Sequence, residues 1–186
     1  MNRILFGLLV VYSNFCFGGS ITFMHYSITD TLVSVNKKFN SAEQLDSVIK
    51  EFDGNYHDVV LDYKELTVLP ESFFKLKKMV NVTIYCDSIA LDNRFGKLKN
   101  LKDIEVVCSK LSSISSELSL SSILERIDIS AKSSYKSIII DIEKLILTCN
   151  SEYFLIGVHD MVWEMEVINN VKVTRRSFPC KDIILK

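Results

Sequence analysis

Apolar residues recur in this chain with a period of about 23 residues, and this repeat limits the folds that the chain can adopt. Successive units begin at Leu66, Ile89 and Leu111, and the rhythm returns more weakly from Ile139. Each unit contains a pair of apolar residues separated by one position. These pairs are Val59 and Leu61, Val82 and Ile84, Ile104 and Val106, Ile127 and Ile129, and Leu145 and Leu147.

The spacing within a unit predicts a strand followed by a return segment. Two inward residues separated by one form a short β-strand that is buried on one face. The apolar positions before them are spaced by three, which suits a helical turn or an irregular arc on the same core. A single unit cannot bury its apolar edge, so the units are expected to stack as parallel neighbours. The predicted fold class is therefore α/β.

Two stretches resemble the phrase of the leucine-rich-repeat family. Leu69–Ile84 resembles LPxxFxxLxxLxxLxL, and Phe95–Val106 is similar to its second half. The resemblance implies a solenoid with a parallel concave β-sheet, short helical or irregular convex arcs, and binding through the concave face. One feature departs from the family, which places an inward Asn three residues after the second strand leucine. The residues at those positions are Lys64, Asp87, Ser109, Lys132 and Asn150, so the last alone conforms.

The repeats are assigned to residues 57–152. The segments on either side of them, 21–56 and 153–186, are expected to act as caps. Ser41 and Gln44 have the spacing of a capping box, so residues 42–52 are predicted to form a helix that covers the edge of the first strand. Within 21–56, the segment 21–35 has the composition of an edge strand. Residues 153–186 are expected to be a degenerate repeat or a β-cap.

The first twenty residues are predicted to be a signal peptide outside the fold. Arg3 precedes an apolar run over 4–12, and small residues follow at 18–20. The run is too short to cross a membrane, which needs about 20 residues. Cleavage is expected near Ser20, with cleavage after Gly18 as a second option, and Cys16 leaves lipidation open. The chain is therefore expected to be secreted or envelope-associated, with membrane contact if this segment is retained or lipidated.

Composition excludes some partners. The 186 residues suit one domain, and 22 basic against 23 acidic side chains give no basic face for nucleic acid. No phosphate-binding or GxSxG motif occurs, and the three His have no ligand spacing, so neither a cofactor nor a metal is expected.

The expected function is a non-catalytic interaction module that binds a protein or other macromolecular partner. Outward residues of the parallel strands are expected to form columns across the sheet. The first column is Val60, Thr83, Glu105, Asp128 and Ile146, and the second is Asp62, Tyr85, Val107, Ser130 and Thr148. A third column is expected to contain Tyr63, Cys86, Cys108, Ala131 and Cys149. The predicted contact residues are Asp62, Tyr63, Thr83, Tyr85, Glu105, Val107, Asp128, Ser130 and Thr148. Aromatic side chains on such a face favour a protein partner.

Two alternatives remain open. The repeats could be a structural spacer in the envelope, tethered by the N-terminus. A cysteine-dependent hydrolase would use Cys149 or Cys180 with His159 and Asp160. Cys86 and Cys108 occupy equivalent positions in adjacent units and are expected to be free thiols, because parallel neighbours hold their Cβ atoms too far apart for a bridge.

Overall fold

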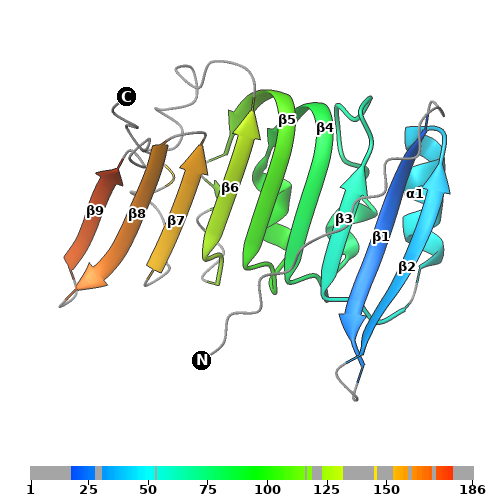
Figure 1. Ribbon diagram of the computed structural model, residues 1–186, viewed down its shortest axis with the longest axis horizontal. Helices are drawn as coiled ribbons and strands as arrows, with labels where there is room; N and C mark the ends of the chain where they lie inside the picture. The colour runs from blue at the N-terminus through cyan, green and yellow to red at the C-terminus, as the bar shows by residue number, and fades with distance from the viewer. Residues whose placement is uncertain are drawn as a thin grey trace, which may run out of the picture.

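A computed structural model describes nine segments of the chain, namely residues 18–27, 31–52, 54–115, 117–118, 123–131, 145, 153–158, 161–168 and 171–177. These segments contain one sheet in the order β2-β1-β3-β4-β5-β6-β7-β8-β9, which forms a continuous row in Figure 1. The strands are β1 (Gly19–Tyr26), β2 (Leu32–Phe39), β3 (Asp58–Asp62), β4 (Asn81–Leu91), β5 (Asp103–Ile114), β6 (Arg126–Ala131), β7 (Tyr153–Val158), β8 (Met161–Ile168) and β9 (Val171–Ser177).

The sheet is parallel in its centre and antiparallel at both ends. Strands β3, β4, β5, β6 and β7 pair in parallel, whereas β1 and β2 at one end and β8 and β9 at the other pair antiparallel. Helix α1 (Ala42–Glu51) and helical turns lie behind the sheet in Figure 1. The two 3₁₀ helices are η1 (Phe73–Lys75) and η2 (Asn93–Lys97). The fold is thus a mixed α/β arrangement with parallel central strands.

The core lies where the alternating apolar residues of neighbouring strands meet. Val59 is in register with Val82, which is in register with Ile104 and then Ile127. All four side chains are at most 2% exposed. The predicted side-by-side arrangement of the first four apolar pairs is therefore confirmed. Phe73 of η1 and Phe95 of η2 pack on this core, with their ring centroids 6.4 Å apart.

The fifth predicted strand, at Leu145 and Leu147, is wrong. Leu145 is helical and fully buried, and β7 is the parallel neighbour of β6, with Ile156 beside Ile127. Ile139, Ile142 and Leu145 are spaced by three, which is the helical spacing, and a short apolar run does not distinguish a strand from a buried helix. The outward positions that were assigned to Ile146 and Thr148 lie outside the described residues.

The N-terminal segment differs from expectation in two respects. Strand β1 begins at Gly19, so the prediction that all of the first twenty residues lie outside the fold is wrong for Gly19 and Ser20. Strand β1 also covers the edge of β3, with Ser20 beside Asp62, whereas helix α1 was expected to cover it. Backbone groups at a strand edge need hydrogen-bond partners, and an antiparallel strand supplies them in a way that a helix cannot.

Helix α1 itself forms where the capping box predicts it. The backbone N–H of Gln44 donates to Ser41 Oγ (3.3 Å), and the backbone N–H of Asn40 donates to Gln44 Oε1 (2.7 Å). This reciprocal pair satisfies amide groups that a helix start leaves without partners. Leu45 and Ile49 form the buried stripe of the helix, and the partly buried ring of Phe52, directly after it, stacks on Phe23 of β1 with centroids 3.7 Å apart. The helix therefore holds the hairpin of β1 and β2 on the core.

Candidate functional site

The face of the parallel sheet opposite α1 presents three rows of side chains, which we call the open face. The first row is Asp58, Asn81, Asp103 and Arg126; the middle row is Val60, Thr83, Glu105 and Asp128; the last row is Asp62, Tyr85, Val107 and Ser130. Side chains alternate between the faces of a strand, so the buried core residues beneath direct these rows outward. All twelve side chains are half-buried or exposed.

The middle and last rows are the columns that the sequence predicts. Seven predicted contact residues occupy them in the expected register across four strands. These residues are Asp62, Thr83, Tyr85, Glu105, Val107, Asp128 and Ser130. On β7, Gly157 stands beside Asp128 at the position that the sequence assigned to Ile146.

The third predicted column is wrong, because its residues are buried. Tyr63 is 6% exposed, Cys86 7%, Cys108 5% and Ala131 4%. On β4, Cys86 is separated by two from Ile84 and therefore points into the same core. Tyr63 packs edge-on against Phe39, with ring centroids 5.2 Å apart, so Tyr63 is removed from the contact surface. Thr148 and Cys149 lie outside the described residues.

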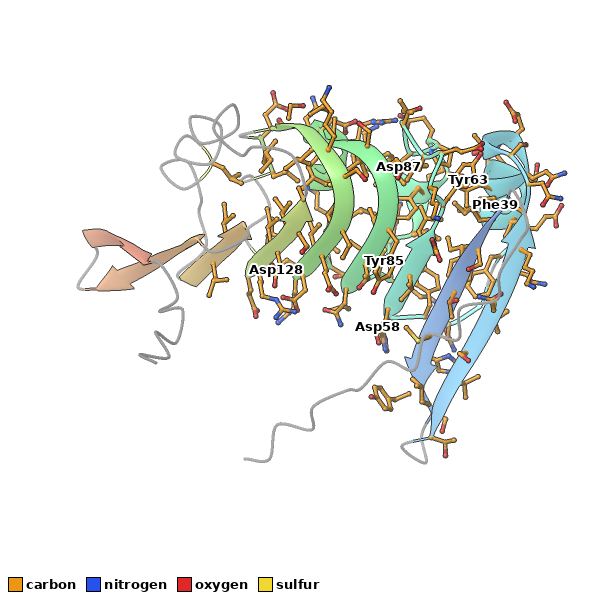
Figure 2. All side chains as sticks on the ribbon, turned by 45° about the horizontal axis from the view of Figure 1, so that its top comes forward. Phe39, Asp58, Tyr63, Tyr85, Asp87 and Asp128 are labelled. Carbon is orange, nitrogen blue, oxygen red and sulfur yellow. The ribbon has the colours of Figure 1, made fainter. Side chains whose placement is uncertain are left out.

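The first row is not among the columns that the sequence predicts. In Figure 2, Asp58 lies at the edge of the sheet where β3 begins, and Tyr63 and Asp87 lie toward the opposite edge. Counting back two residues from Val60, Thr83, Glu105 and Asp128 identifies the first row, because residues two apart share a face. The alternation in the sequence therefore also indicates the first row, although the predicted columns begin only at the middle row.

Hydrogen bonds tie neighbouring strands together along the rows. Asn81 Nδ2 donates to Asp58 Oδ1 at 2.5 Å, and Thr83 Oγ1 donates to Glu105 Oε2 at 3.1 Å. Arg126 Nε donates to Asp103 Oδ1 at 3.1 Å. Each bond joins residues 22 or 23 positions apart in the chain. The open face is therefore held in place by contacts between successive units.

The open face is acidic. Its carboxylates are those of Asp58, Asp62, Asp103, Glu105 and Asp128, and Asp87 of β4 follows the last row. Arg126 is the one cation in the three rows. Burial raises the pKa of Asp103, and the charge of Arg126 beside it partly offsets this rise. A surface lined by one sign of charge attracts groups of the opposite sign.

The cysteines of the described strands are not activated. Cys86 and Cys108 lie beside each other on β4 and β5, and both are free and buried. Burial raises the pKa of Cys86 to about 12, and burial also raises the pKa of Cys108. A thiol nucleophile needs the opposite shift. Cys149, His159 and Cys180, which belong to the hydrolase alternative, lie outside the described residues.

In the described part of the chain, no group of three or more His, Cys, Asp or Glu side chains is arranged to hold a metal ion. No helix in that part is long and apolar enough to cross a membrane. No protein-family model matches the chain, and it matches no curated protein and no solved structure.

Proposed function

We propose that the chain is a small leucine-rich-repeat solenoid that binds a protein partner through its open face, which is the concave face of such a solenoid. The observation that carries the proposal is the register of the middle and last rows across β3, β4, β5 and β6. Strands about 4.8 Å apart make these rows a continuous platform. The return segments that contain η1 and η2, which precede β4 and β5, agree with the repeat.

The composition of the platform favours a basic polypeptide segment as the partner. Carboxylates surround the half-buried side chains of Tyr85 and Val107, which lie beside each other in the last row. Aromatic anchors supply much of the binding energy in interfaces, and peripheral charges mainly raise the association rate. Lys or Arg side chains of the partner would meet Asp62 and Asp128 while an apolar side chain covers Tyr85.

We also propose that the chain is exported by its N-terminal segment. If a signal peptide is removed, cleavage after Gly18 leaves the whole of β1 in the mature chain, whereas cleavage after Ser20 removes the pairs that Gly19 and Ser20 make with Phe39 and Lys38. We therefore favour the first position, with secretion or the envelope as the destination. The mass of the mature N-terminus tests this point, because a chain beginning at Ile21 contradicts it.

The binding proposal is tested by charge reversal on the open face. Asp62→Lys with Asp128→Lys is expected to weaken retention of a partner from the native extracellular mixture by about tenfold or more. Glu65→Lys with Glu117→Lys is the matched control, because both glutamates are exposed and lie outside the three rows. Equal loss in both variants, or no partner retained by the unaltered chain, contradicts the proposal. Melting temperatures of both variants should stay near that of the unaltered chain.

A further inference from the structure

Strand β2 is the end strand of the sheet, and it carries an unusual share of exposed apolar surface. Its outer edge has no neighbouring strand among the residues that the structure describes. Five large apolar side chains of those residues are exposed, namely Tyr26, Leu32, Val33, Val35 and Val68. The first four belong to the hairpin of β1 and β2, so the exposed apolar surface is concentrated at this edge.

A hollow lies beside this edge, between β2 and α1. It is about 310 Å³ in volume and is lined by Val35, Lys37, Val48, Glu51 and Phe52. Its walls combine apolar side chains with one cation and one anion. An added strand beside β2 would place every second side chain over this hollow.

The backbone of β2 is arranged to accept such a strand. The N–H of Ser27 donates to the carbonyl of Thr31 at 2.9 Å, which makes these residues a hydrogen-bonded pair of the hairpin. Hydrogen-bonded and non-hydrogen-bonded pairs alternate in antiparallel strands. Continuing the register therefore directs the backbone groups of Val33, Val35 and Lys37 toward β1. The backbone groups of Leu32, Ser34, Asn36 and Lys38 are directed outward.

We propose that β2 pairs antiparallel with β2 of a second copy of this chain, with Val35 on the two-fold axis. This register pairs Ser34 with Asn36 of the second copy and forms about eight backbone hydrogen bonds. It places Val33 of the second copy opposite Lys37, over the hollow. The exposed valines of each copy thus cover the hollow of the other, so the surface is self-complementary.

The charges of this edge agree with the two-fold register. Lys37 and Lys38 lie at one end of β2, so antiparallel pairing places the two lysine pairs at opposite ends of the ladder. Lys37 of the second copy is opposite Val33 and diagonal to Val35, within reach of a long side chain toward Glu51. Lysines often protect strand edges against pairing, but here they leave the stretch from Leu32 to Asn36 uncharged.

Sedimentation velocity and a cysteine crosslink test the proposal. The full chain is expected to sediment as a dimer at tens of micromolar, and Val35→Lys is expected to raise the dissociation constant about tenfold or more. Val35→Cys is expected to form a disulfide-linked dimer on mild oxidation, because non-hydrogen-bonded partners have close Cβ atoms. Val68→Lys and Val68→Cys are matched controls on a more exposed valine outside the hairpin.

Three results would overturn the proposal. The first is a monomer at every concentration. In that case the edge of β2 either pairs with a strand of another protein or is kept from pairing by its lysines. The second is a dimer that persists in Val35→Lys when circular dichroism shows a native fold. The third is crosslinking at residue 68 that equals crosslinking at residue 35. None of these results bears on partner binding by the open face, which is tested separately.

Discussion

The guanidinium of Arg94 lies over the ring of Phe74, with Cζ 4.4 Å from the ring centroid, and connects two successive arcs of the fold. The same side chain donates to Asp92 Oδ2 at 2.7 Å and to Glu71 Oε1 at 3.1 Å. It also donates to the carbonyl of Leu69 at 3.2 Å. Residues 69–74 precede β4 and Arg94 precedes β5, so one side chain joins the return segments of neighbouring strands.

Arg94→Ala is expected to destabilise the fold by about 1 to 3 kcal/mol, because it removes a cation–π contact and charge-assisted hydrogen bonds from a largely buried side chain. Urea unfolding measures the effect. Lys97→Ala is the control, because Lys97 contacts Glu71 at 3.4 Å from an exposed position and should change stability by less than about 1 kcal/mol. Equal effects of the two variants would show that Arg94 has no special role.

The contribution of Arg94 should depend on pH. The hydrogen bond from Arg94 lowers the pKa of Glu71 from its ordinary 4.5. Burial raises the pKa of Asp92, but hydrogen bonds from Arg94 outweigh it and lower the pKa from 3.8 overall. Carboxyls with depressed pKa values stabilise the fold above their unfolded pKa and lose this contribution as pH falls through the folded one. The stability difference between the unaltered chain and Arg94→Met should therefore shrink below about pH 4. A difference that is constant from pH 7 to pH 3 contradicts this prediction.

The Cys86 thiol should resist alkylation in the native chain. A pKa raised from 9.0 to about 12 lowers the thiolate fraction at pH 8 by roughly a thousandfold. Peptide mass spectrometry after iodoacetamide treatment is expected to find Cys86 unlabelled until urea unfolds the protein. The contribution of this thiol to the free energy of unfolding is fully present below pH 9.0 and is lost as pH rises toward about 12. The reason is that Cys86 ionises at a lower pH in the unfolded chain than in the folded chain. Rapid native labelling would show that the thiol is not buried.

Gly19→Ala should destabilise the fold by about 1 to 3 kcal/mol, the usual cost of overpacking. A Cβ at this position would lie 2.6 Å from the carbonyl oxygen of Asp62 and 2.6 Å from Cζ of Phe39. The first contact is with backbone, so the strand itself would have to move. Gly96→Ala is the control, because its closest contact would be 3.6 Å. Thermal unfolding that is unchanged by Gly19→Ala contradicts the placement of Gly19 between β2 and β3.

Much of the open face could be predicted from residue spacing. Val82 and Ile84 must be buried in any stacked repeat, and burial of these two residues directs Thr83 and Tyr85 outward. The same argument, extended by two residues, places Cys86 inside, so its predicted exposure was an error of phase. The capping box at Ser41 and Gln44 likewise predicts a helix from local hydrogen bonding alone.

The sequence by itself determined the parallel neighbours β3, β4, β5 and β6 and the outward rows, because both depend on a period along the chain. It also determined the helix at 42–51, because the capping box marks the start of that helix through local hydrogen bonds. Tertiary structure alone decided that β1 covers β3, that β7 rather than Leu145 follows β6, and that Phe39 is the ring against which Tyr63 packs. These outcomes depend on which strand supplies the hydrogen-bond partners of an exposed sheet edge and on which aromatic rings come into contact. Such choices are made between segments distant in the chain, where periodicity carries no information.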